Sequence, residues 1–131
     1  MLCLPGCGGG DSTYPAGGRV TLPDGTPLDG GVVEFRTLEN DPPVGARGLI
    51  QSDGTFQLTT YEPGDGALAG KHQALVVPKR PPRDQWNELQ RSGRLKMIHP
   101  KYQRFSSSGL EFTVTPKPSE NDFHITVERE E

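Results

Sequence analysis

The sequence is poor in cysteine, in tryptophan and in apolar residues generally. It has two cysteines and one tryptophan among 131 residues, and 31% of the chain is hydrophobic. Because Cys3 and Cys7 both lie near the N-terminal end, the rest of the chain must be held by packing rather than by disulfide bonds. A Cys-x-x-x-Cys pair without a second Cys or His pair does not predict a structural metal site. No stretch reaches the ~18 consecutive apolar residues of a membrane-spanning helix.

Glycine and proline, by contrast, are abundant. The 17 glycines and 13 prolines together exceed a fifth of the chain. Low apolar content can indicate disorder, but here the apolar residues recur in short alternating runs separated by turn residues. A turn-rich β-sandwich of one domain accounts for both features.

The net charge of −3 argues against a general nucleic-acid binder, but it hides an asymmetry. Residues 78–109 hold eight basic and two acidic residues, a net +6, which leaves −9 for the remainder. The basic residues of this segment are Lys79, Arg80, Arg83, Arg91, Arg94, Lys96, Lys101 and Arg104. A basic segment therefore sits on an acidic body.

Near the N-terminus, Leu4-Pro5-Gly6-Cys7 resembles the lipobox of bacterial lipoproteins, in which Cys7 would receive the lipid. The small residues of 8–13 would then be a tether, and residues 1–17 together a lipobox remnant and flexible linker. Six residues precede Cys7, fewer than the basic and apolar regions of a signal peptide occupy. The lipobox interpretation therefore requires a start codon upstream of Met1. The alternative is a plain disordered terminus.

From residue 18 onward, alternating apolar residues predict seven short strands. Asp53-Gly54 is typical of a tight hairpin turn, and Phe56 and Leu58 share one face of the strand that follows. Val33 and Phe35 are expected to face inward in the same way. The predicted strands cover residues 19–22, 31–36, 47–51, 55–61, 71–77, 110–114 and 123–127. We therefore predict an all-β fold, a seven-stranded Greek-key β-sandwich with one short helix in a long insert.

The insert, residues 78–109, interrupts the strand pattern. Within it, Asp84 can cap a short helix Gln85–Ser92, which the following glycine would end. Trp86 and Tyr102 are interleaved with the cations. We expect these aromatics to hold the insert on the sandwich, with the helix across a sheet edge. In the alternative, the insert binds an anionic polymer and stacks on sugar rings. The candidate partner surface consists of Trp86, Arg91, Arg94, Lys96, Lys101, Tyr102 and Arg104.

Several motifs follow one known order, namely residues 19–22 (RVTL), 24–28 (DGTPL), 30–35 (GGVVEF), 52–58 (SDGTFQL) and the strand from Gly70-Lys71. Together they resemble the carboxypeptidase regulatory-like, transthyretin-related (prealbumin-like) β-sandwich. Residues 59–67 (TTYEPGDGA) and 97–102 (MIHPKY) are similar to a subgroup of small bacterial envelope lipoproteins. The resemblance covers residues 18–128, and it implies a seven-stranded fold, an extracytoplasmic location and no established activity. His72 departs from it, because the family commonly has an aromatic residue there.

No catalytic or metal-binding constellation stands out. Alternation places His72 inward and His124 outward, while His99 lies in the insert, so the histidines do not predict a zinc site. The serines of residues 106–108 lack a nucleophile-elbow context. Transthyretin-related hydrolases use a C-terminal Tyr-Arg-Gly-Ser tail, which the ending Val127–Glu131 lacks.

The sequence disfavours two further chemistries. Lys71, Asn121 and Glu62 are the residue types of an intramolecular Lys–Asn bond, but alternation points Lys71 outward. Asp53 and Asp65 lack the dense spacing of a calcium loop, and turn chemistry explains both. We expect no cofactor and no metal.

These observations favour a non-enzymatic, lipid-anchored cell-envelope module, structural or ligand-binding. Its expected location is extracytoplasmic, on the periplasmic side of a bacterial membrane or at the cell surface. The alternative is a periplasmic or secreted domain that binds carbohydrate or an anionic polymer through residues 78–109. An uncharacterised hydrolase is a third class. The expected partners are the membrane, through the lipid on Cys7, and an envelope polysaccharide or protein. We expect a monomer and no nucleic-acid partner.

Overall fold

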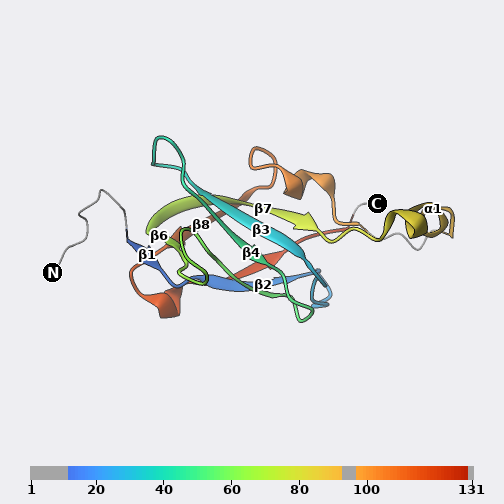
Figure 1. Cartoon of the computed structure of the whole chain (residues 1–131), viewed down its shortest axis with the longest axis horizontal. Coiled ribbons are helices and arrows are strands. Elements are labelled where there is room, and N and C mark those ends of the chain that lie inside the picture. The colour runs from blue at the N-terminus through green and yellow to red at the C-terminus, as the bar shows by residue number, and fades with distance from the viewer. Residues whose placement is uncertain (1–11, 93–96, 130–131) are drawn as a thin grey trace.

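A computed structural model describes residues 12–92 and 97–129 of the chain. In these residues it has nine β-strands, one α-helix and two short 3₁₀ helices, Pro100–Gln103 and Pro118–Glu120 (Figure 1). The strands are β1 (Thr13–Tyr14), β2 (Gly17–Thr21), β3 (Gly31–Thr37), β4 (Gly45–Leu49), β5 (Thr55–Gln57), β6 (Ala67–Leu68), β7 (Gly70–Pro78), β8 (Leu110–Val114) and β9 (Asp122–Thr126), and the helix is α1 (Arg83–Ser92). The expected β-rich architecture is confirmed.

The strands form three sheets. The largest has the order β4-β3-β7-β8 and is antiparallel throughout. The second has the order β5-β2-β9, in which β2 and β9, near opposite ends of the chain, run parallel. The third is the two-residue pair β1-β6. Strands β1 and β6 were not predicted, and β1 lies within residues 1–17, which were expected to be a linker.

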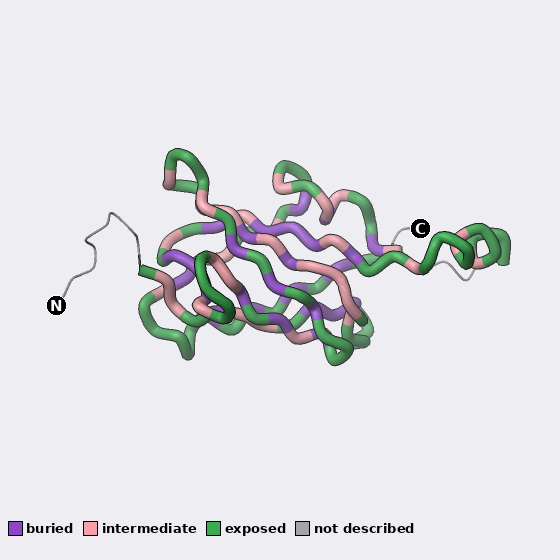
Figure 2. The backbone as a smooth tube through the Cα atoms, viewed as in Figure 1, coloured by how far each residue is buried: buried purple, intermediate pink, exposed green. Residues whose placement is uncertain are grey.

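The hydrophobic core lies between the four-stranded and three-stranded sheets (Figure 2). Phe35 of β3 is 1% exposed, and its ring centroid lies 5.7 Å from that of Phe123 in the opposite sheet. Phe112 of β8 stacks on Phe35 at 5.6 Å and meets Phe123 at 5.1 Å. The alternation read from the sequence is confirmed, since Val33, Phe35 and Phe56 are buried. Aromatic contacts across the two layers thus join the sheets.

The turn at Asp53-Gly54 forms, and the segments on its two sides pair antiparallel at Arg47 and Thr59, each of which donates its backbone N–H to the other's carbonyl. The Asp53 carboxylate accepts hydrogen bonds from the backbone N–H and the hydroxyl of Thr55 at 3.1 and 2.6 Å. Gly54 has a φ of +85°, which glycine adopts without steric cost. β5 then pairs with β2 in the other sheet, while β4 stays in the four-stranded sheet. The turn therefore carries the chain from one layer to the other.

The insert divides into two parts with different relations to the sandwich. α1 has no buried residue, and it lies beyond one end of the sandwich (Figure 1). The prediction that the helix crosses a sheet edge is therefore wrong. α1 also begins at Arg83, so Asp84 stands in its first turn rather than at the cap, and Gln85 N–H donates to the Pro82 carbonyl at 2.9 Å. The expected glycine stop lies outside the described residues.

Candidate functional site

Three of the predicted site residues lie outside the described residues. These are Cys7, the expected lipid attachment point, and Arg94 and Lys96 of the expected partner surface. The remaining five residues of that surface are described, and the structure separates them into two groups. Within residues 12–92 and 97–129, no helix is long and apolar enough to cross a membrane.

The first group belongs to the second half of the insert, which is fixed to the body. Tyr102 is 5% exposed, and its hydroxyl accepts a hydrogen bond from the backbone N–H of Glu128 at 3.2 Å. Lys101 lies over the Tyr102 ring, 5.1 Å from its centroid, and its ammonium is 3.6 Å from the Glu128 carboxylate. Tyr102 thus packs against the body, as expected from the sequence, and it is not available as a partner surface. Arg104 is exposed beside it.

Two more contacts secure this half of the insert. The Arg36 guanidinium of β3 lies 4.4 Å from the centre of the Phe105 ring, and it also donates to the Gln73 side chain at 3.0 Å. The buried Ser108 hydroxyl donates to the Ala74 carbonyl of β7 at 2.6 Å. Residues 97–109 are therefore part of the folded body. The sequence had given no reason to separate them from the helix.

The second group lies at α1 and the residues before it, which we call the tip, residues 79–92. The expectation that Trp86 packs against the sandwich is wrong, because α1 has no buried residue. Trp86 is half-buried at the tip itself, where the Arg80 guanidinium lies 5.8 Å from the centre of its ring. An open pocket of about 550 Å³ at this point is lined by Arg80, Pro81, Arg83, Trp86 and Asn87. A planar aromatic ring, two guanidinium groups and one amide are thus gathered at a surface that faces solvent.

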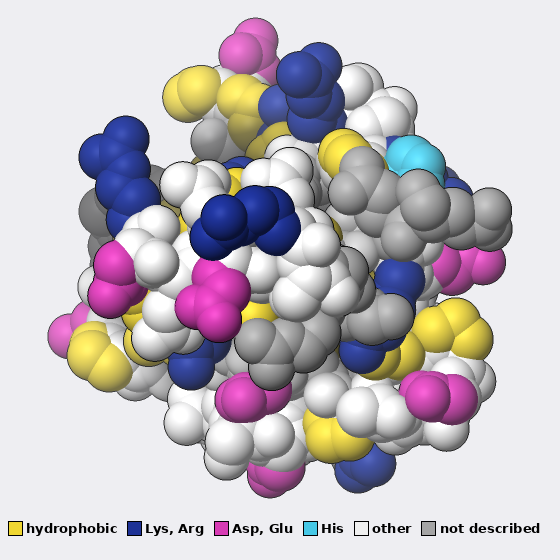
Figure 3. All heavy atoms as spheres, turned by 90° about the vertical axis from the view of Figure 1, so that its right-hand side faces the viewer, with side chains coloured by type: hydrophobic (Ala, Val, Ile, Leu, Met, Phe, Trp, Pro, Cys, Tyr) yellow, Lys and Arg dark blue, Asp and Glu magenta, His cyan; other side chains and the backbone are white. Residues whose placement is uncertain are grey.

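The tip is not uniformly basic. The end of the molecule that carries α1 shows Lys and Arg side chains with acidic side chains between them (Figure 3). α1 itself contains Asp84 in its first turn and Arg91 in its last, and both charges interact favourably with the helix dipole. Arg91 lines a second open pocket with Asn87 and Gln90. Sequence reasoning named Trp86 and Arg91 but left Arg80 and Arg83 out of the candidate surface, although their closeness to Trp86 along the chain was a usable signal.

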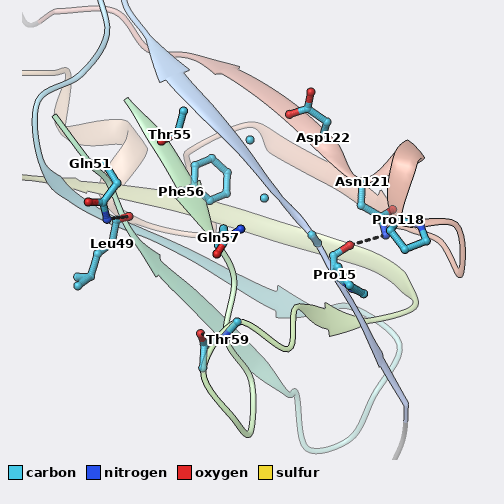
Figure 4. Close-up of a pocket in the computed structure, with 14 residues that line it drawn as sticks. Pro15, Leu49, Gln51, Thr55, Phe56, Gln57, Thr59, Pro118, Asn121 and Asp122 are labelled. Carbon is cyan, nitrogen blue, oxygen red and sulfur yellow. Dashed lines mark hydrogen bonds between the residues drawn. The ribbon is translucent and has the colours of Figure 1, made fainter. Parts of the chain in front are cut away.

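A larger open groove of about 640 Å³ lies on the outer side of the three-stranded sheet (Figure 4). Gly17 and Gly18 are among its lining residues. Both positions require glycine, because a Cβ on Gly17 would clash with the Phe56 carbonyl and one on Gly18 with the Phe123 carbonyl. Asn121 braces one side, since its amide donates to the Pro15 and Thr115 carbonyls at 3.0 and 2.8 Å. The remaining lining residues are Pro15, Ala16, Leu49, Gln51, Thr55, Phe56, Gln57, Thr59, Gly64, Pro118 and Asp122. The groove holds one carboxylate and no nucleophile–base pair, so its shape has a structural cause and no evident chemistry.

The histidines lie apart, as alternation predicted. His72 is 1% exposed in the core, whereas His124 points outward and its Nε2 lies 2.8 Å from the Thr21 hydroxyl. His99 is exposed, and its Nδ1 accepts a hydrogen bond from the backbone N–H of Lys101 at 3.1 Å. Among the residues that the structure describes, no three His, Cys, Asp or Glu side chains are grouped to hold a metal ion.

The two aspartates considered for calcium are turn residues. Hydrogen bonds from the Thr55 hydroxyl and backbone lower the pKa of Asp53. Burial by itself would raise the pKa of Asp65, but the backbone N–H groups of residues 60–62 outweigh it and hold this pKa below its usual value. Lys71 is exposed and Asn121 is bonded to Pro15 and Thr115, so the structure does not bring them together for a Lys–Asn bond.

Comparison with known proteins finds no family model that matches the chain, no matching curated protein and no matching solved structure. The transthyretin-like resemblance therefore rests on the sequence motifs alone.

Proposed function

We propose that this chain is a non-enzymatic cell-envelope module that is anchored by a lipid on Cys7 and binds an anionic polysaccharide through its tip. The proposal assigns it to the carboxypeptidase regulatory-like, transthyretin-related sandwiches, with Greek-key connections. The observation that carries the binding role is the place of Trp86, which stands on a helix with no buried residue rather than against the core. A tryptophan whose role was packing would be expected to lie in the core.

The chemistry of the tip fits a sugar polymer that bears carboxylate or phosphate groups. Aromatic rings stack on the apolar faces of sugars, while arginine offers a planar set of donors that matches carboxylate and phosphate oxygens. Arg80 and Arg83 line the same pocket as Trp86, and Asn87 adds an amide that can donate to and accept from hydroxyl groups. Neutral polymers would use the ring and the amide but not the two cations.

The position of the tip supports an anchored module. The described chain begins at Ser12 at one end of the sandwich, and α1 lies beyond the other end (Figure 1). A lipid attached before Ser12 would hold the first end near the membrane. The tip would then face away from that membrane, toward polymers of the envelope.

The binding test uses the full chain with a polyuronate, and with neutral dextran as the comparison. Arg80→Glu with Arg83→Glu should abolish polyuronate binding at low salt, and Trp86→Ala should weaken it, because the ring that stacks on the apolar face of the sugar is lost. Wild-type binding should weaken as salt rises, because a Debye length of about 10 Å at 0.1 M screens the charges. All variants should melt at the wild-type temperature.

Lys117→Glu is the matched control for either single variant, Arg80→Glu or Arg83→Glu, because it makes the same change of charge at an exposed site just before the 3₁₀ helix Pro118–Glu120. Equal loss of binding in this control would indicate a net-charge effect and contradict a site at the tip. A lowered melting temperature for Trp86→Ala would instead assign the ring a structural role. Turnover of acyl or cyclic-amide substrates by the full chain would contradict the non-enzymatic assignment.

The anchor has a separate test. The several acyl chains of a bacterial lipoprotein hold it firmly on a membrane, whereas one chain does so only marginally. In cells that express the complete gene, Cys7→Ser should move the protein from the membrane fraction to the soluble fraction, with its melting temperature unchanged. If the variant stays with the membrane, the lipobox hypothesis is wrong.

A further inference from the structure

His72, the third residue of β7, is a buried titratable group to which the proposed function gives no role. It is 1% exposed, and its ring lies 5.6 Å from that of Phe35. Its Nε2 is 2.8 Å from the carbonyl oxygen of Leu68 in β6. Because a carbonyl only accepts, Nε2 must carry the hydrogen, and in a neutral ring Nδ1 is then unprotonated. Nδ1 is buried and has no hydrogen-bond partner within the described chain.

Among the residues that the structure describes, no charged side chain lies beside the ring to stabilise a second proton. Across β3 and β8, His72 pairs in register with Thr37 and Phe112, and β6 has no charged residue. The charged residues of these strands and of β7 alternate to the opposite face, away from the ring; they are Glu34, Arg36, Lys71 and Glu111. The titratable residue of β1, Tyr14, pairs with Ala67 and packs against the core.

Protonation would therefore be costly while the ring stays buried. Burial lowers the pKa of His72, and the hydrogen bond to the Leu68 carbonyl opposes that effect only in part. The unfolded state binds the proton first, so stability is complete above about pH 6.5 and falls as the pH drops below that value. The loss ends once the pH is below the lowered pKa of the folded state.

The hydrogen bond to Leu68 connects protonation of His72 to one small part of the fold, the β1-β6 sheet. β6 pairs with β1 through two residue pairs, Thr13↔Leu68 and Tyr14↔Ala67, and both β6 residues are buried. The β1-β6 sheet is the smallest in the described fold, whereas β3 and β7 pair over seven residues. Opening of the small sheet would let water reach Nδ1 without disrupting the large one.

We propose that His72 is an acid-sensitive latch. The neutral ring holds β6, and through it β1, against the four-stranded sheet. The doubly protonated ring still donates from Nε2 to Leu68, but its charge and its Nδ1–H are buried without an acceptor in the closed structure, and opening of the β1-β6 pair relieves both by admitting water. Since β1 is where the described chain enters the fold, acid would loosen the connection between the sandwich and the segment that precedes it. This inference does not depend on the proposed function of the tip.

Amide hydrogen exchange on the full chain, corrected for intrinsic rates, tests the latch between pH 7.5 and pH 5. The protection of residues 13–14 and 67–68 should fall by up to about tenfold per pH unit below pH 6.5, the limit for uptake of one proton. The amides of β3 and β7 should keep their protection. In His72→Gln, whose side-chain amide can still donate to Leu68 but does not titrate, the fall should disappear. His124→Gln, at an exposed histidine, should behave like the wild type.

A second measurement keeps the proposal testable if His72→Gln does not fold. Titration of the wild-type imidazole signals by NMR should give His72 a pKa below the ordinary histidine value of about 6.5. Three outcomes would overturn the latch. They are a His72 pKa near 6.5, an equal loss of protection in all strands, which would mean global unfolding, and an acid response that persists in His72→Gln.

Discussion

Replacing Phe35 by alanine is the sharpest test of how the two sheets are joined. The ring is 1% exposed and contacts the rings of His72, Phe112 and Phe123 at centroid distances of 5.6, 5.6 and 5.7 Å. Loss of a buried phenylalanine costs about 3–5 kcal/mol, and each lost aromatic pair adds to the burial term. We therefore expect Phe35→Ala to lose about 4–5 kcal/mol of unfolding free energy.

This loss is large but survivable for a domain of this size. A chain of 131 residues has a total stability of about 7–20 kcal/mol at typical values per residue. The unfolding entropy expected for that length translates the loss into a melting temperature lower by roughly 15 °C. In urea the midpoint should fall by about 2 M at an ordinary slope for a small domain.

The assay compares Phe35→Ala with its neighbour Glu34→Ala in urea titrations followed by circular dichroism. Glu34 is half-buried on the opposite face of β3, and its truncation should cost less than about 0.5 kcal/mol. Phe35→Leu serves if the alanine variant does not fold, and its smaller cavity should cost roughly 1.5 kcal/mol. Equal midpoints for Phe35→Ala and Glu34→Ala would refute the packing of the two layers through this ring.

Two further outcomes follow from single hydrogen-bonding groups. Tyr102→Phe removes the hydroxyl that accepts from the Glu128 N–H at 3.2 Å, and a thermal melt should show a loss of about 1 kcal/mol; a melt identical to wild type would mean that this bond does not help to hold residues 97–109. Asp65→Asn removes a carboxylate whose pKa is lowered by backbone N–H groups. Because the folded-state pKa lies below the unfolded value of 3.8, the wild type should lose this stabilisation as the pH falls below about 4, and the variant should lack that part of the acid response in unfolding titrations.

Strand periodicity was the reliable part of the sequence. Predicted strands 71–77 and 110–114 correspond to β7 and β8 within one residue at each end, because residues of alternating burial repeat every second position. The same rule placed His72 inward and Lys71 outward. The rule does not identify strand partners, so it did not predict that β5 pairs with β2, although Arg47 and Thr59 on the two sides of the Asp53-Gly54 turn do form an antiparallel bridge. Pairing depends on residues far apart in the chain, which local alternation does not encode.

The two-residue strands β1 and β6 were missed for a related reason. Neither is long enough to show a period, and the Gly-rich stretch before β1 favoured a linker through residue 17. Their pairing depends on tertiary contacts, including the burial of Ala67 and Leu68 and the His72 hydrogen bond to the Leu68 carbonyl. The sequence does contain a buried histidine at a position where related sandwiches are expected to have an aromatic residue. The sequence does not show that the partner of this ring is the Leu68 carbonyl.

In the insert, composition did not predict which aromatic residues pack on the body and which do not. Its aromatics and cations were treated as one surface, yet Tyr102 is 5% exposed in the body while Trp86 stands on a helix with no buried residue. Both are aromatic residues within a basic segment, so their sequence neighbourhoods are alike. The difference arises from Ile98 and Ser108, buried residues on either side of Tyr102 that bring residues 97–109 back onto the strands. No buried residue lies in α1 to do the same for Trp86. The tip, residues 79–92, is therefore the better candidate for an interaction surface, because it does not pack on the core. Charge reversal at Arg80 and Arg83 tests the tip without changing residues 97–109.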